Sequence, residues 1–96
     1  MRRLPSMFNN TSRGANMAHA ILRLPQVLEN RGRSRSSHYA DIKNGLFTPP
    51  VNIGLRAVGW PAYEVAVLNA ARIAGKSEQE IQLLVAKLKV ARAGVR

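Results

Sequence analysis

A short run of hydrogen-bond donors between residues 33 and 43 is the part of the sequence best suited to binding an anion. Its donors are Arg33, Arg35, Ser36, Ser37, His38, Tyr39 and Lys43. A guanidinium group makes paired hydrogen bonds to a phosphate or to the O6 and N7 atoms of guanine, and a hydroxyl group bonds either partner. The chemistry predicted for this run is therefore the binding of a polyanion.

Catalytic and metal-binding patterns are weak by comparison. The two histidines, His19 and His38, do not stand at a metal-ligand spacing, and the chain has no cysteine. No set of nucleophile, base and orienting group can be assembled. Gly75-Lys76-Ser77 matches the end of a P-loop, but Ala70 stands where that motif requires glycine, and the segment before it is helical in pattern. We expect no enzyme, no metal and no cofactor.

The charge balance points to the same partner class. Lysine and arginine total 15 against 5 acidic residues, which gives a formal charge of +10, and 11 of the basic residues are arginine. Such a charge attracts polyanions, and arginine is the better bidentate ligand for phosphate and guanine. Nucleic acid is the leading partner. The alternative from composition alone is a ribosome-like or merely solubilising basic surface.

The 96 residues suffice for one small domain, whose core must be largely aliphatic because only 5% of residues are aromatic. No apolar run reaches the ~18 residues that span a bilayer, and the N-terminus lacks the apolar part of an export signal. We therefore expect a cytoplasmic protein without membrane contact. Residues 1–18 lack periodicity and are predicted to be a disordered basic arm, followed by a folded domain over residues 19–75 and a C-terminal helix over residues 76–96.

Residues that typically begin or end helices flank this run of donors, and they predict the secondary structure that carries it. Pro25 suits the first turn of a helix that Gly32 ends at its left-handed position. Ser34 is predicted to cap a second helix, with its hydroxyl accepting from the N–H of residue 36 or 37, and Gly45 follows that helix. Its apolar side is thin, consisting of Ile42, part of Tyr39 and Ala40. The predicted arrangement is a helix, a tight turn and a second helix with a contact surface.

The next segment reads as a β-hairpin. Residues 51–53 and 58–60 alternate in period two, and Gly54 fits the first central position of a II′ turn. This places Arg56 at the tip and Asn52 on the outer side. The inner side is predicted to hold Val51, Ile53, Val58 and Trp60.

Two more helices follow. Pro61 precedes a helix over residues 62–74, for which we expect Tyr63, Val65, Val67, Leu68 and Ala71 to face inward. Ser77 and Glu80 form a capping box that opens the last helix. The apolar stripe of this helix is Ile81, Leu84, Val85, Leu88 and Ala91. It packs either on the domain or on a second subunit.

A set of residues spread over positions 21–68 forms a recognisable pattern. It consists of Arg23-Leu24-Pro25, Val27-Leu28, Gly32, Ser34-Arg35-Ser36, Tyr39, Ile42-Lys43, Gly45, Phe47, Pro50-Val51, Gly54, Arg56 and Val58-Gly59-Trp60. In this pattern the segment resembles the AlpA family of phage and prophage regulators, which are relatives of excisionases. The resemblance implies a mainly α fold with a small β-hairpin wing, that is, a winged helix-turn-helix of the MerR and excisionase kind, to which the C-terminal helix is added. The chain departs from the family at Arg33, His38 and Asp41, where apolar residues are usual.

The family resemblance implies a sequence-specific regulator of prophage genes that binds double-stranded DNA. It leaves open gene activation, antitermination with loading onto RNA polymerase, and excision as a directionality factor. The protein could bind DNA as a homodimer or as side-by-side copies. The resemblance also implies that it associates with the bacterial nucleoid. An alternative of another class is a general RNA-binding protein, although the sequence lacks the aromatic stacking platform that single strands favour.

The candidate contacts follow from the helix and the hairpin together. Arg35, Ser36 and Ser37 in the first turn of the second helix are expected to contact bases or phosphates. His38 is expected either to touch DNA or to be partly exposed. Tyr39 and Lys43 are expected to reach the flanking backbone. The full set of predicted DNA-binding residues is Arg33, Arg35, Ser36, Ser37, His38, Tyr39, Lys43, Asn52 and Arg56.

Overall fold

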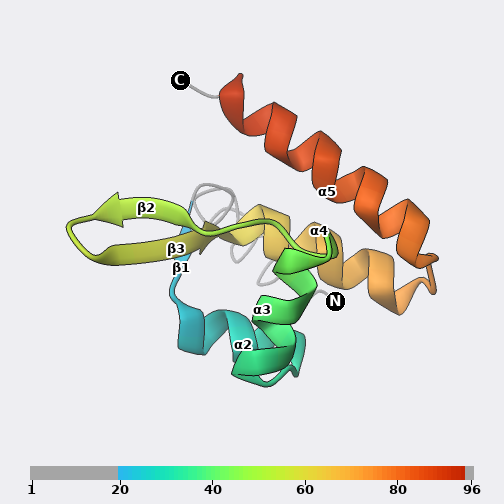
Figure 1. Cartoon of the computed structure of the whole chain (residues 1–96), viewed down its shortest axis with the longest axis horizontal. Coiled ribbons are helices and arrows are strands. Elements are labelled where there is room, and N and C mark those ends of the chain that lie inside the picture. The colour runs from blue at the N-terminus through green and yellow to red at the C-terminus, as the bar shows by residue number, and fades with distance from the viewer. Residues whose placement is uncertain (1–19, 95–96) are drawn as a thin grey trace, which may run out of the picture.

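Four helices and a three-stranded antiparallel sheet make up the computed structural model, which describes residues 20–94 (Figure 1). The basic arm predicted over residues 1–18 lies outside the described residues. The mainly helical fold with a hairpin wing is confirmed. In chain order the elements are β1 (Ile21–Leu22), α2 (Leu24–Arg31), α3 (Arg35–Lys43), β2 (Val51–Gly54), β3 (Ala57–Pro61), α4 (Ala62–Ile73) and α5 (Glu78–Ala93).

The ends of α2 and α3 are where the local signals predicted them. Pro25 lies in the first turn of α2, and Gly32 ends that helix with a φ of 65°. The Ser34 Oγ atom caps α3 by accepting from the Ser37 N–H at 3.2 Å. Gly45 follows α3 with a φ of 77°. Only three residues separate the two helices, so the turn between them is tight.

The sheet has the order β1-β3-β2. β1 pairs with β3 through Ile21 opposite Pro61 and Leu22 opposite Trp60. Gly59 is needed for this pairing, because a Cβ atom there would collide with the Ile21 side chain and lie 2.9 Å from the Leu22 carbonyl oxygen. This pairing, which makes residues 21–22 a third strand, was not predicted from the sequence.

The hairpin of β2 and β3, here called the wing, is confirmed, but its predicted turn is wrong by one residue. Leu55 and Arg56 are the central residues, and Arg56 has a φ of 61°, whereas Gly54 pairs with Ala57. A register shift between Asn52 and Gly54 accounts for the difference, because it adds one residue to β2.

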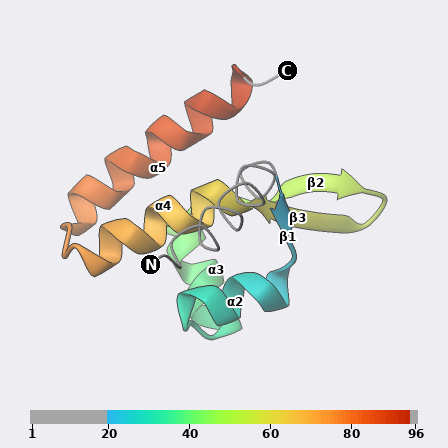
Figure 2. The same ribbon diagram turned by 180° about the vertical axis from the view of Figure 1, so that it is seen from behind.

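The predicted inner side of the wing is only partly buried. Trp60 is fully buried, while Ile53 and Val58 are 41% and 37% exposed. The wing projects beyond the helices (Figures 1 and 2), so its outer half has no core to cover it. The prediction that Ile53 and Val58 face a core is therefore wrong.

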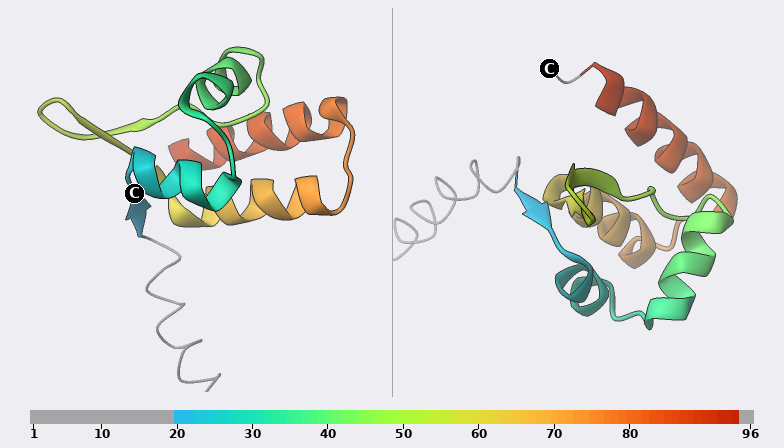
Figure 3. Two further views of the ribbon diagram at one scale, coloured as in Figure 1. Left: turned by 90° about the horizontal axis from the view of Figure 1, so that it is seen from below. Right: turned by 60° about the vertical axis from the view of Figure 1, so that its left-hand side comes forward.

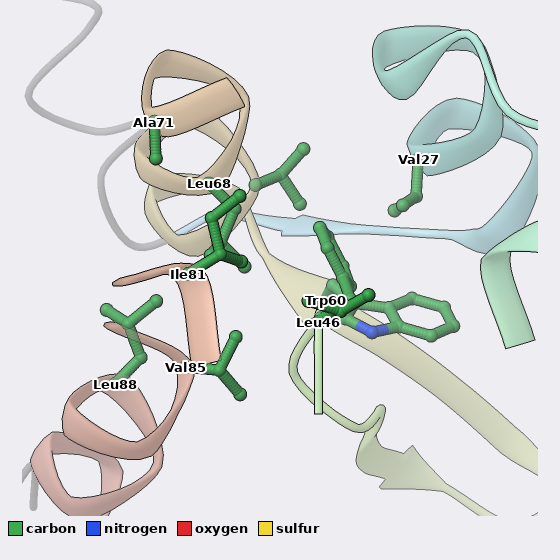
Figure 4. Close-up of a cluster of buried hydrophobic side chains, with 10 residues drawn as sticks. Val27, Leu46, Trp60, Leu68, Ala71, Ile81, Val85 and Leu88 are labelled. Atoms are coloured by element: carbon green, nitrogen blue, oxygen red, sulfur yellow. The ribbon is translucent and has the colours of Figure 1, made fainter. Parts of the chain in front are cut away.

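The core lies between α2, α4, α5 and β3 (Figure 4). The indole N–H of Trp60 donates to the Thr48 carbonyl oxygen at 2.9 Å, which satisfies its polar atom inside the core. Val67 was expected inside and is 38% exposed. The buried apolar side chains are Val27, Leu46, Phe47, Trp60, Val65, Leu68, Ala71, Ile81, Val85 and Leu88.

The last helix, α5, packs its apolar stripe on its own domain, which is one of the two arrangements that the sequence left open. Ser77 and Glu80 form the predicted capping box. At the other end, Arg92 makes two hydrogen bonds to the carboxylate of the fully buried Glu64, at 2.7 and 2.8 Å, and a third to the Pro49 carbonyl oxygen at 2.7 Å. Gln82 also donates to the Asn44 carbonyl oxygen at 3.0 Å. These contacts tie α5 to α4, to the end of α3 and to the segment that precedes the wing.

Candidate nucleic-acid interface

One face of α3 is exposed and carries most of the predicted donors. Arg35, Ser36, Tyr39 and Lys43 are all exposed, and their spacing places them on one side of the helix. Ser37 is half-buried next to the Ser34 cap. The exposed face offers a guanidinium, an ammonium and two hydroxyl groups, with no carboxylate among them.

The opposite face of α3 is polar, and His38 belongs to it. His38 was predicted to touch DNA or to be partly exposed. This prediction is wrong, because the side chain is 0% exposed. Its ring meets the Phe47 and Trp60 rings edge to face, with centroid distances of 5.1 and 5.0 Å. His38 is thus a core residue that supports α3 from behind.

The protonation of His38 follows from its neighbour. The guanidinium of Arg31 lies 2.7 Å from Nδ1, and since arginine can only donate, Nδ1 accepts and the ring hydrogen resides on Nε2. Nε2 has no hydrogen-bond partner among residues 20–94. Burial, and then the positive charge of Arg31, lower the pKa of His38 to about 4. The ring is therefore neutral at physiological pH.

Asp41 is the centre of an arginine cluster beneath α3. Its carboxylate accepts from Arg31 at 2.7 Å and from two nitrogens of Arg33 at 2.9 and 3.1 Å, and Arg72 lies 3.9 Å away. Burial alone would raise the pKa of Asp41, but the hydrogen bonds and charges of Arg31 and Arg33 outweigh it and lower the pKa. One carboxylate faces three guanidinium groups, so the cluster retains an excess of positive charge.

The members of this cluster differ in their access to solvent. The Arg31 side chain is 1% exposed and lies over the Phe47 ring at 4.0 Å, whereas the side chains of Arg33 and Arg72 are 37% and 38% exposed. Arg31 is structural. Arg33, a predicted contact, and Arg72 stay partly available for a phosphate. Arg72 was not predicted, because its proximity to α3 depends on the packing of α4 and has no local sequence signal.

The wing presents Arg56 at its tip, as predicted. Arg56 is exposed next to Leu55, which is 94% exposed. Asn52 is also exposed, and in the orientation that satisfies its amide it donates to the Gly54 and Ala57 carbonyl oxygens, at 3.1 Å each. Asn52 therefore braces the turn across the two strands, a role that sequence reasoning missed.

The helix α3 and the wing extend toward a common side of the molecule. In the view from below, α3 and the wing lie toward the same side of the molecule, with α4 on the other (Figure 3, left). Arg23, at the start of α2, ties that helix to the wing, because its Nε atom donates to the Val58 carbonyl oxygen at 3.1 Å. Within residues 20–94, the structure contains no cluster of three potential metal ligands, and none of its helices is long and apolar enough to span a bilayer.

Two short helices joined by a tight turn, followed by a hairpin that projects from the domain, define a winged helix-turn-helix. The family model described as prophage CP4-57 regulatory protein (AlpA) matches residues 20–67, which is half of the chain. The chain belongs to the AlpA family.

A curated phage protein also matches part of the chain. The chain is 44% identical over 56 residues to the uncharacterized protein ORF88 of Enterobacteria phage P4, an alignment that covers 58% of this chain and 64% of the phage protein. The match thus spans less than two thirds of that relative's length. No solved structure matches the chain significantly.

Proposed function

We propose that this protein is a sequence-specific regulator of prophage-type genes that binds double-stranded DNA through α3 and the wing. The observation that carries the proposal is the exposed face of α3, where Arg35, Ser36, Tyr39 and Lys43 gather without a carboxylate. An α-helix fits the major groove of B-DNA, whose base edges such donors can read.

The residues divide into two roles. Arg35 and Ser36 stand in the first turn of α3 and reach base edges, with Ser37 beside them. Tyr39 and Lys43, farther along the same face, bond the flanking phosphates. Each base contact contributes specificity, whereas each phosphate contact contributes affinity that falls with salt.

A second group of residues binds the backbone beside the helix. Arg56 at the wing tip is free to meet the neighbouring phosphates, and Arg33 at the edge of the cluster meets those near the start of α3. Asn52 contributes mainly by holding the wing turn, although its exposed amide leaves room for a contact. The excess positive charge around Asp41 strengthens attraction to DNA from beneath α3.

Footprinting on duplex DNA that flanks the protein's own gene tests this proposal. Protection of a defined stretch, at protein concentrations that leave unrelated DNA uncovered, is the expected result. Equal coverage of all fragments would favour a non-specific basic protein instead. Equal affinity for single-stranded RNA would favour the general RNA-binding alternative.

The regulatory outcome is proposed to be positive. Run-off transcription across a promoter and a downstream terminator separates two modes: activation raises initiation alone, while antitermination raises read-through and requires association with RNA polymerase. Binding confined to attachment-site DNA, with no change in either readout, would identify a recombination directionality factor.

A further inference from the structure

The segment that joins α3 to the wing is held at both ends by α5. This segment, residues 44–50, is here called the connector, and it forms no helix or strand (Figure 1). Its middle is anchored in the core by the buried side chains of Leu46 and Phe47. Its two ends are bonded to side chains of α5, a helix outside the residues 20–67 that the family model matches. The helix α5 thus lies where it can control how the wing is attached to α3.

At the α3 end of the connector, the anchor is Gln82. Its Nε2 atom donates to the carbonyl oxygen of Asn44, the residue that directly follows α3, at 3.0 Å. The same side chain packs beside Gly45, where an added Cβ atom would lie 3.8 Å from the Gln82 Cγ atom. The last carbonyl groups of a helix have no partner inside the helix, so Gln82 supplies one of them with a donor. This bond ties the end of α3 to α5.

At the other end of the connector, Arg92 bonds both sides of the wing base. Its guanidinium donates to the carbonyl oxygen of Pro49, two residues before β2, at 2.7 Å. It also donates at 2.7 and 2.8 Å to Glu64 in the first turn of α4, the helix that directly follows β3. Pro49 and Pro50 have no N–H, so this part of the connector cannot donate to the sheet, and Arg92 holds it instead.

The two anchors belong to one rigid element. Gln82 and Arg92 stand ten residues apart on α5, which is about 15 Å along a helix axis. We propose that α5 is a positioning element for DNA recognition: it fixes the wing relative to α3, so that both surfaces meet a duplex at one spacing. The consequence for DNA rests on the proposed function, whereas the fixed placement of the wing relative to α3 does not.

Pulsed electron spin resonance of the full chain without DNA tests the fixed placement. The chain has no cysteine of its own, so spin labels can be attached at Ala40→Cys on α3 and Leu55→Cys at the wing tip. Both positions are exposed, and a tilt of the wing moves its tip farthest. Gln82→Glu keeps the shape of the side chain but removes the donor to Asn44. It should broaden the distribution of distances between the two labels.

The matched control is Gln79→Glu, which adds the same charge at another exposed position of α5 and should leave the distribution unchanged. Arg92→Lys keeps a cation for Glu64 but loses the planar fork that bonds three oxygen atoms, so it should also broaden the distribution. Circular dichroism shows whether each variant keeps its helices. A distribution that is already broad in the wild type, or one that stays narrow in both Gln82→Glu and Arg92→Lys, would overturn the proposal.

A double-mutant cycle on duplex DNA tests the consequence for recognition. Gln82→Glu should weaken duplex binding about two- to tenfold relative to Gln79→Glu, the range that one lost hydrogen bond can produce. In the background of Arg56→Gly the two glutamine variants should bind equally, because the wing then has no cation to position. Equal losses in both backgrounds would show that Gln82 supports only the fold, and would contradict the proposal. A wild type that fails to bind duplex DNA, with a narrow distance distribution, would contradict the proposed function and leave the fixed placement of the wing supported.

Discussion

At the residue scale, the inner face of α3 is a polar cluster instead of an aliphatic one. Arg31 donates to both His38 and Asp41 beneath the helix, and the Phe47 and Trp60 rings pack edge to face on His38. A buried charge is tolerated when a partner and hydrogen bonds compensate it, as Arg31 does for Asp41. The cluster holds α3 in position and places guanidinium groups behind the face that is proposed to meet DNA.

His38 should make the stability of the fold depend on pH. Its pKa of about 4 in the folded chain lies below the ordinary value of 6.5, so the unfolded chain binds more protons between these pH values. The free energy of unfolding should therefore fall as the pH is lowered from about 6.5 to 4. Urea unfolding at a series of pH values measures it.

The matched variant for this prediction is His38→Leu, which removes the titrating ring. Its unfolding free energy should change much less over the same pH range, whatever its absolute stability. Asp41, whose pKa is lowered below 3.8, contributes its own loss of stability only at more acidic pH. If the unfolding free energies of the wild type and of His38→Leu fell in parallel between pH 6.5 and 4, the assignment of His38 as a neutral buried ring would be wrong.

Arg56 should contribute affinity without sequence preference. Its φ of 61° is unfavourable for an arginine, so Arg56→Gly removes the charge and relieves the backbone at once. This variant should bind all duplexes more weakly and lower the slope of log affinity against log salt by about one. Fluorescence anisotropy over a salt series measures the slope. If Arg56→Gly weakened the affinity for one DNA sequence only, Arg56 would contact bases instead of the backbone.

At the element scale, local signals predicted most of the helix ends. Pro25, Gly32, the Ser34 cap and the Ser77 capping box act within a few residues of where they stand. The pairing of β1 with β3 was missed, because it joins residues some forty positions apart. The turn of the wing was misplaced for a related reason: the register shift in β2 depends on how its strand pairs, and Gly54 alone is compatible with either turn.

The candidate site was predictable on its exposed side and not on its buried side. Arg35, Ser36, Tyr39 and Lys43 share one helical face that the sequence spacing alone defines. Predicting the burial of His38 would have required knowing that it contacts Arg31, which lies seven residues earlier and on another helix. Periodicity identifies a polar residue on an inner face as an anomaly, but the partner that compensates it appears only when the helices are packed.

The ion pair of Glu64 and Arg92 should anchor α5. Arg92→Ala would leave a fully buried carboxylate unpaired, and we expect it to lower the free energy of unfolding by about 2–4 kcal/mol, less than for a fully enclosed pair because Arg92 is 22% exposed. Thermal and urea unfolding measure this loss. Lys89→Ala, an exposed cation on the same helix, serves as control and should change stability by less than about 0.5 kcal/mol.

Pairing Arg92→Ala with Glu64→Gln isolates the contact itself. The double variant should recover part of the loss, because no charge is then buried without a partner. If both single variants and the double variant were as stable as the wild type, α5 would be held by its apolar strip alone.

At the scale of the whole molecule, two surfaces face different directions. The helix α3 and the wing lie toward one side (Figure 3), and α5 lies beyond α4 (Figure 1). The first surface is cationic and is proposed to bind DNA. The second is the exposed apolar side of α5, which includes Leu83 and Val90.

Selection of bound duplexes from a random-sequence library tests the central claim most directly, with the wild type and Arg35→Ala compared at the same salt concentration. The wild type should recover one motif that contains a guanine. Arg35→Ala should lose preference at that position alone, at a cost of about 1–3 kcal/mol. Recovery of no common motif by a wild-type protein that still binds duplex DNA, or an unchanged motif with Arg35→Ala, would contradict sequence reading by α3.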